Sequence, residues 1–220
     1  MTKTAIIIGA SRGLGLGLAT ELTARGWQVT ATQRTPSAAL AAVAGVIVET
    51  VDIDNVAAVA ALTRRQPGPF DLVFVNAGVL GPPQASADSV TADQLAALML
   101  TNAVAPVRIA RALLGAIRPG GTIAFMTSIM GSVALRQHGI NALYGASKAA
   151  LNSLTRGFAA VEAKGFTVVN FHPGWVRTDM GGAEAAIDVA TSVAGMANLL
   201  EAETVPGHRF LDYSGEALPW

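Results

Sequence analysis

The chain lacks cysteine altogether and carries few charged or aromatic side chains. With no Cys among its 220 residues, disulfides, zinc–thiolate sites and iron–sulfur clusters are excluded. Only 14% of the residues are charged, and fifteen basic residues balance fifteen acidic ones. The chain therefore has no basic excess of the kind that nucleic-acid binding requires. Aromatic residues make up 5% against 51% hydrophobic residues, which predicts an aliphatic core and excludes intrinsic disorder.

Long hydrophobic runs are also missing. The longest continuous apolar stretches, residues 38–48 and 57–62, fall short of the roughly 20 residues that a membrane-spanning helix needs. Arg12 interrupts the apolar beginning of the chain before a secretory signal can form. We expect a cytoplasmic protein that binds neither membrane nor nucleic acid.

Short β-branched runs alternate with longer stretches rich in alanine and leucine. This alternation predicts one α/β domain over residues 1–220, a Rossmann fold with a doubly wound parallel sheet of about seven strands and helices on both faces. The expected strands are residues 4–9, 28–33, 46–50, 72–75, 122–127, 167–172 and 208–211. The expected helices are residues 15–25, 55–65, 92–118, 143–163 and 185–201.

Two of these helices, 92–118 and 143–163, are apolar almost all round. A helix that only covers its own sheet should keep one polar side. We therefore expect a homodimer formed through these two helices, although simple alanine richness would give the same pattern.

A glycine-rich segment follows the first expected strand and opens the first expected helix. Gly9 permits a tight turn, and Gly13 and Gly15 let the backbone and the helix N-terminus approach a pyrophosphate. The position in the fold raises the weight of this motif, which alone is weak. A glycine-rich turn without a ligand is the alternative.

The end of the second strand indicates which dinucleotide would bind. An NAD site has an acidic residue there for the ribose 2′-hydroxyl, whereas this strand ends in Thr32, Gln33 and Arg34. Arg34 and Arg12 flank the expected pocket with no opposing carboxylate, which favours NADP(H) over NAD(H); solvated surface arginines are the alternative. Asp52 is expected to accept from the adenine amino group, or else to cap the helix 55–65.

Four polar residues form a candidate catalytic set. Tyr144 and Lys148 lie four residues apart and share a helical face, so we expect the ammonium to lower the pKa of the phenol. Ser128 follows the fifth strand and could hold a substrate carbonyl oxygen. Asn102 lies within a long helix, where asparagine is a mediocre choice without another reason.

Together these motifs resemble the short-chain dehydrogenase/reductase family over nearly the whole length. The resemblance rests also on Asn76-Ala77-Gly78 after the fourth strand and on Pro173-Gly174 followed by Thr178. It implies an NADPH-dependent carbonyl reductase in which Tyr144 is the general acid and Ser128 polarises the carbonyl. It further implies that Lys148 holds the nicotinamide ribose and that Asn102 anchors a water of a proton relay. The cofactor-binding residues implied are Gly9, Ser11, Arg12, Gly13, Leu14, Gly15, Arg34, Asp52, Ile53, Asn76, Ala77, Gly78, Tyr144, Lys148, Pro173, Gly174, Val176 and Thr178.

The segment between Ser128 and Tyr144 is slightly longer than is usual in that family, since the two residues are sixteen apart. This feature and the ending over residues 210–220 are similar to the sniffer-type carbonyl reductases and the C-factor branch. An NADP(H)-binding regulatory protein with little turnover is the competing function. No metal is expected, because His138, His172 and His208 lack ligand spacing. A lipophilic carbonyl substrate is expected from the mostly apolar surrounding residues Leu80, Ile129, Met130, Leu135, Ile140, Trp175 and Met180.

Overall fold

The strands of the described residues form one seven-stranded parallel sheet with the order β3-β2-β1-β4-β5-β6-β7. The computed structural model describes residues 2–66, 68–82, 87–202 and 205–220. The order reverses at β1, as in a doubly wound sheet, so the predicted fold class is confirmed. The strands are β1 (Thr4–Ile8), β2 (Gln28–Gln33), β3 (Ile47–Thr50), β4 (Phe70–Val75), β5 (Ile117–Met126), β6 (Thr167–His172) and β7 (Gly207–Asp212).

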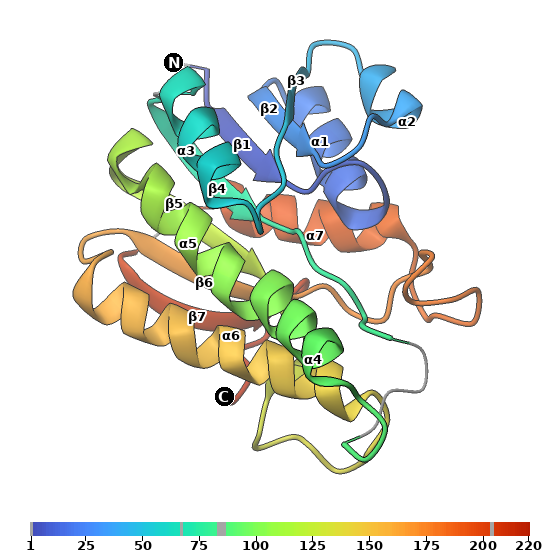
Figure 1. Cartoon of the computed structure of the whole chain (residues 1–220). Helices are drawn as coiled ribbons and strands as arrows, with labels where there is room; N and C mark the ends of the chain where they lie inside the picture. The colour runs from blue at the N-terminus through green and yellow to red at the C-terminus, as the bar shows by residue number, and fades with distance from the viewer. Residues whose placement is uncertain (1, 67, 83–86, 203–204) are drawn as a thin grey trace.

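Helices cover both faces of the sheet (Figure 1). The helices α1 (Gly13–Ala24), α2 (Ala38–Ala41) and α7 (Val189–Glu201) pack on one face, and α3 (Val56–Arg65), α5 (Ala105–Leu113) and α6 (Ala142–Val161) pack on the other. Each face has its own core, in which the few aromatic rings meet. Phe74 stacks on Phe171 in one core, and Phe125 meets Phe158 edge-on in the other.

The long helix expected over residues 92–118 is divided. It consists of α4 (Ala92–Met99), a wide π-helical turn (Leu100–Val104), α5 and a short 3₁₀ turn (Leu114–Ala116). Pro106 has no N–H to donate to the carbonyl of Asn102, which explains why the regular ladder is interrupted here. The last two expected residues are instead in β5, because Ile117 pairs with Phe70 at the start of the strand.

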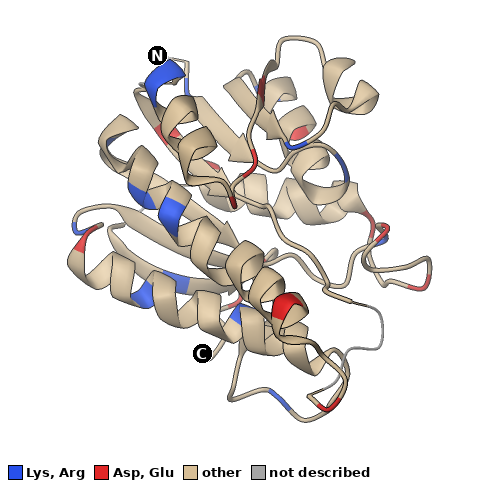
Figure 2. Ribbon diagram, in the orientation of Figure 1, with Lys and Arg blue, Asp and Glu red and all other residues tan. Residues whose placement is uncertain are grey.

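The helical run 92–116 is long and apolar enough to cross a membrane by length and composition, but 50% of its most apolar window is buried within the fold. The expectation that it is apolar all round is wrong for α5. Ile109 and Leu113 are buried there, whereas Arg111 is exposed on the opposite side. Charged side chains are sparse over the rest of the ribbon (Figure 2).

Capping residues account for two further differences from the expected elements. Helix α7 begins at Val189 rather than 185, because the Asp188 carboxylate accepts a hydrogen bond from the backbone N–H of Thr191 at 2.8 Å. Helix α2 was not expected; Ser37 caps it by accepting from the N–H of Leu40 at 3.2 Å.

Candidate active site

A cleft of about 770 Å³ runs along the carboxyl ends of the strands. Six strands deliver residues to it: the glycine segment follows β1, Arg34 follows β2, Asp52 follows β3, Asn76 follows β4, Thr127 follows β5 and Pro173 follows β6. The carboxyl edge at a point where strand order reverses is where open α/β sheets bind ligands. The topology therefore gathers motifs that lie far apart in the sequence.

Two glycines of this segment sit where no side chain fits. A Cβ on Gly9 (φ +88°) would lie 2.8 Å from Ala77, and one on Gly15 would lie 2.2 Å from the Gly9 carbonyl oxygen and 2.6 Å from Nδ2 of Asn76. Nδ2 of Asn76 donates to that same carbonyl at 2.6 Å. Gly15 thus packs closely against the Gly9 carbonyl and Asn76, and it does not line the cleft.

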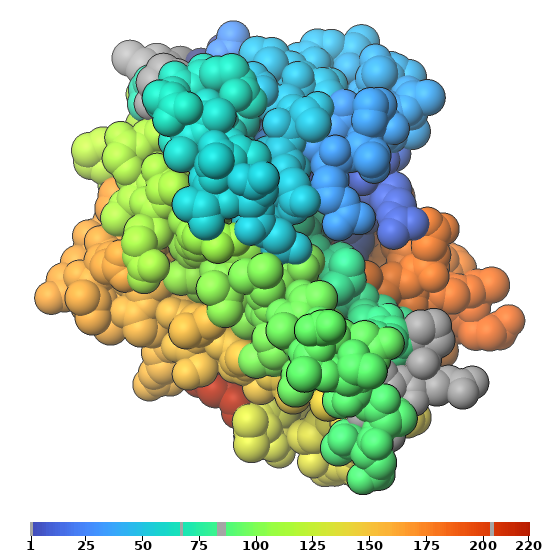
Figure 3. All heavy atoms as spheres, viewed as in Figure 1, coloured from blue at the N-terminus to red at the C-terminus, as the bar shows by residue number. Residues whose placement is uncertain are grey.

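The two arginines expected at the cofactor phosphate both line the cleft and are exposed. The expectation that no carboxylate opposes them is wrong for Arg12, whose Nη1 lies 2.8 Å from Oδ2 of Asp179. Asp179 follows Thr178 in the segment after β6, and this segment lies beside the glycine segment at the surface (Figure 3). Arg34, by contrast, makes no ion pair with any described carboxylate.

Two carboxylates after β3 line the cleft, and one of the two roles expected for Asp52, the helix cap, is excluded. Asp52 does not cap α3, because Asn55 does so by accepting from the N–H of Ala58 at 3.1 Å. Instead, Oδ1 of Asp52 accepts from the N–H of Asp54 at 3.0 Å. Asp54 also lines the cleft, and while its Oδ2 accepts from Thr101 at 2.6 Å, its buried Oδ1 has no partner in the described structure.

Ser128, Tyr144 and Lys148 meet beside the cleft. The Ser128 hydroxyl lies close enough to the Tyr144 phenol to lower the pKa of Tyr144, and Nζ of Lys148 lies 5.7 Å from the centre of the Tyr144 ring. The buried ammonium donates to the carbonyl of Met126 at 3.0 Å. Helix α6, which begins at Ala142, carries both Tyr144 and Lys148, and Ser128 comes directly after β5 and Thr127.

Burial dominates the electrostatics of this group. It raises the pKa of Tyr144 to about 12, and the hydrogen bond from Ser128 lowers that pKa only in part. The expected lowering by Lys148 is therefore wrong for the protein alone. Burial also lowers the pKa of Lys148 to about 8, because a desolvated ammonium is less stable than the neutral amine.

Asn102 lies in the wide turn and is fully buried. Its amide accepts from the N–H of Val79 at 2.8 Å and donates to the carbonyl of Val79 at 2.7 Å. It also donates to Ser147 at 3.0 Å, and Ser147 donates to the carbonyl of Tyr144 at 2.7 Å. The side chain of Asn102 thus joins the segment after β4 to the first turn of α6.

Most of the residues expected at the cofactor line the cleft, including the four glycine-segment residues next to Gly9. Gly15, Asn102, Ser128, Gly174 and Val176 are not among the lining residues. Gly174 and Val176 instead pack the segment after β6: Val176 pairs with Ile187, and a Cβ on Gly174 would lie 2.6 Å from the same Ile187. The lining residues that sequence reasoning missed are Thr32, Gln33, Thr35, Pro36, Ser37, Val51, Asp54, Val79, Thr101, Met126, Thr127 and Asp179.

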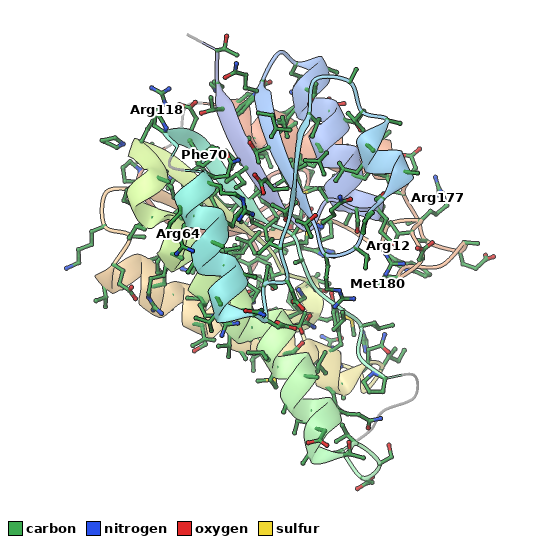
Figure 4. The ribbon with its side chains drawn as sticks, turned by 45° about the horizontal axis from the view of Figure 1, so that its top comes forward. Arg12, Arg64, Phe70, Arg118, Arg177 and Met180 are labelled. Atoms are coloured by element: carbon green, nitrogen blue, oxygen red, sulfur yellow. The ribbon has the colours of Figure 1, made fainter. Side chains whose placement is uncertain are left out.

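Of the seven residues expected around the substrate, Met180 lines the cleft, where it lies near Arg12 (Figure 4). The other six are not among the cleft-lining residues. Five of these six are large apolar side chains at the surface: Leu80, Ile129, Leu135, Ile140 and Trp175. The part of the chain that the structure describes holds no group of three His, Asp or Glu residues able to bind a metal ion.

Comparisons with known proteins match this geometry. The family model for short chain dehydrogenases matches residues 3–187. The C-signal protein of Myxococcus xanthus is 40% identical over 158 residues, which cover 70% of this chain and 94% of that protein. The crystal structure of a carbonyl reductase from Pseudomonas aeruginosa PAO1 in complex with NADP has a TM-score of 0.93 at 43% identity over 100% of both chains.

The carbonyl reductase Sniffer of D. melanogaster is similar in structure as well, with a TM-score of 0.88 at 28% identity over 100% of both chains. The resemblance to this branch that the sequence indicated is confirmed. The family model covers far more than half of the chain. The chain therefore belongs to the short-chain dehydrogenase family.

Proposed function

We propose that this protein is an NADPH-dependent carbonyl reductase that reduces a lipophilic ketone or aldehyde to an alcohol. The observation that carries the proposal is the meeting of three side chains: the Ser128 hydroxyl is close enough to Tyr144 to lower its pKa, and the buried Lys148 ammonium lies 5.7 Å from the Tyr144 ring. Two hydroxyl donors that converge on one point are suited to bind a carbonyl oxygen and to give it a proton.

The cleft fits a phosphorylated dinucleotide. Gly9 and Gly13 line the cleft with backbone rather than side chains where α1 begins, and Arg12 and Arg34 supply guanidinium groups for a 2′-phosphate. When bound, NADPH would supply the hydride that reduces the carbonyl carbon. The similar Pseudomonas reductase, whose structure holds NADP, supports this choice of cofactor.

Tyr144 is the proton donor in this proposal. With its pKa raised to about 12, its phenol is protonated across the neutral range and so is ready to donate to the carbonyl oxygen. Ser128 donates a second hydrogen bond to the same oxygen and orients it. Lys148, whose Nζ lies 5.7 Å from the centre of the Tyr144 ring, would hold the nicotinamide ribose when the cofactor is bound.

Asn102 takes a supporting part. The side-chain amide of Asn102 is already engaged in three hydrogen bonds to Val79 and Ser147. The relay water implied by the family resemblance would therefore bind to the backbone carbonyl of Asn102. Pro106, four residues on, cannot donate a helical hydrogen bond to that carbonyl.

A lipophilic substrate is supported by the apolar surface near the site. Trp175 and Met180 lie in the segment after β6 and are 57% and 46% exposed, and Ile129 directly follows Ser128. The carboxylate of Asp179, next to Met180 in the sequence, pairs with Arg12. A charged metabolite that is turned over far better than uncharged aryl or alkyl ketones would contradict this substrate class.

The competing function is NADP(H)-dependent regulation without turnover, and the similarity to the C-signal protein favours it. The distinguishing experiment follows oxidation of NADPH and of NADH by absorbance against a panel of uncharged ketones and aldehydes. Turnover with NADPH well above NADH supports the reductase. Cofactor binding with no turnover on any carbonyl supports the regulator.

We further propose that the chain acts in the cytoplasm as one domain, and as a homodimer through α5 and α6. Val104, directly before α5, and Leu154 on α6 are 46% and 42% exposed, and a second copy would cover them. Val104→Glu with Leu154→Glu should convert a dimer to a monomer in analytical sedimentation. Ile47→Glu on the outer strand β3 is the control, and a monomeric parent protein would refute the dimer.

A further inference from the structure

A cluster of buried polar side chains lies behind Ser128. Asn152 on α6 and Asn170 on β6 are at most 4% exposed, as are Thr127 and Thr155. Burying amides and hydroxyls costs free energy unless each finds a partner. Each of these four side chains does so within the cluster, and none of them belongs to the catalytic set proposed above.

Asn152 holds the chain on both sides of Ser128. Its Oδ1 accepts from the hydroxyl of Thr127 at 2.8 Å, and its Nδ2 donates to the carbonyl of Gly131 at 3.2 Å. Between these two points the chain makes one 3₁₀ turn, in which the N–H of Met130 donates to the Ser128 hydroxyl at 3.1 Å. One amide group therefore forms hydrogen bonds to both ends of the segment that carries Ser128, at Thr127 and at Gly131.

The orientation of the Asn152 amide is itself fixed. Nδ2 of Asn170 donates to Oδ1 of Asn152 at 2.9 Å and to the hydroxyl of Thr155 at 2.8 Å. Two donors thus converge on Oδ1 of Asn152, which leaves its Nδ2 facing the carbonyl of Gly131. The turn also packs closely on α6, since a Cβ on Gly131 would lie 2.8 Å from the carbonyl carbon of Lys148.

We propose that Asn152 is a positioning residue for carbonyl reduction, acting through Ser128 rather than on the substrate. This inference rests on the proposed function, because it assumes that the Ser128 hydroxyl binds the carbonyl oxygen. The amide fixes the Ser128 hydroxyl against Tyr144, and both lie on segments that the Asn152 side chain or its helix holds. Without the amide, the turn 129–131 relaxes and the two hydroxyls no longer converge.

A double-mutant cycle separates this role from general stability. Asn152→Leu keeps a similar volume and removes all three hydrogen bonds. We expect it to lower kcat/KM for carbonyl reduction by about tenfold or more while the Kd for NADPH is unchanged. In a Ser128→Ala background, the same substitution should change kcat/KM by less than about twofold, because residues that act as a unit are not additive.

Leu200→Ala on α7 is the matched control. Leu200 is buried in the core on the other face of the sheet, so its truncation lowers stability without touching the Ser128 segment. We expect it to lower the urea midpoint as Asn152→Leu does, with kcat/KM unchanged. If Asn152→Leu does not fold, Asn152→Ser, which is too short to reach both partners, takes its place in the cycle under the same criteria.

Each outcome decides the matter. If the losses from Asn152→Leu and Ser128→Ala multiply in the double variant, the positioning role is overturned. If Ser128→Ala retains full turnover, or if no carbonyl is reduced, the proposed function fails. Hydrogen exchange of the Met130 and Gly131 amides in the NADP-bound protein then tests the positioning itself. Faster exchange at these two amides in Asn152→Leu supports it, and unchanged exchange overturns it.

Discussion

Arg12 and Asp179 form an ion pair, with 2.8 Å between Nη1 and Oδ2, that joins the glycine segment to the segment after β6. The two side chains are 77% and 78% exposed, and ion pairs this exposed contribute little to stability. The guanidinium can therefore exchange the carboxylate for a cofactor phosphate at little cost. Asp179 competes with the cofactor for Arg12.

Asp179→Asn should accordingly tighten the binding of NADPH. The substitution removes both the competitor for Arg12 and a negative charge near the cofactor phosphates, so we expect the Kd to fall by roughly two- to fivefold at low salt and by less at high salt. Fluorescence titration at two ionic strengths measures this. Asp93→Asn at the start of α4 is the control. Weaker NADPH binding in Asp179→Asn would mean that the pair instead closes over the bound cofactor.

Replacing the phenol of Tyr144 should remove the proton donor. We expect Tyr144→Phe to lower kcat by about 10² to 10⁴ with the Kd for NADPH within about twofold of the parent. Tyr213→Phe replaces the only other tyrosine and should leave kcat unchanged. Steady-state rates and fluorescence titration provide the two readouts. Turnover that survives in Tyr144→Phe would assign the proton to another group.

Lys148 should make stability depend on pH in the weakly alkaline range. Its pKa is about 8 in the folded protein against an ordinary 10.5. Between these values the unfolded chain binds the proton and the folded chain does not, so the free energy of unfolding rises with pH. Urea unfolding at pH values just below 8 and well above it should show this rise in the parent. Lys148→Met should lose it, and an identical rise in both proteins would refute the assignment.

Two Gly→Ala substitutions should have opposite effects. Gly15→Ala places a methyl group 2.2 Å from the Gly9 carbonyl oxygen, so it should lower both the melting temperature and cofactor affinity. Gly157→Ala lies inside α6 with no atom near the added methyl group, and it should stabilise the protein by about 0.5–1 kcal/mol. Thermal melting measures both. Equal losses in the two variants would contradict the steric explanation.

Sequence reasoning predicted the sheet and brought out the candidate catalytic residues because their signals are local. A glycine segment after a strand, or Tyr144 and Lys148 four residues apart, can be recognised within a few positions. Asp179 could not be paired with Arg12 in this way, since 167 residues separate them. Asn152 was missed because nothing in the sequence distinguishes a buried amide in a helix from an exposed one.

The pKa of Tyr144 was misjudged for a related reason. The neighbouring charge of Lys148 is visible in the sequence, whereas the burial that outweighs it depends on the whole fold. The wide turn at Asn102, in contrast, had a usable signal. Pro106 follows Asn102 by four residues, which is the spacing of a helical hydrogen bond that proline cannot make.

That wide turn also sets the phase between the two halves of its helix. Successive residues of an α-helix are rotated by about 100°, so one extra residue in Leu100–Val104 turns α4 relative to α5. Leu98 can then face inward on α4 while Ile109 and Leu113 face the sheet on α5. Deleting any single residue from the turn would rotate one half away from its partners, even if every remaining side chain were kept. The packing therefore constrains the number of residues in this helical run, just as it constrains the choice of asparagine at position 102.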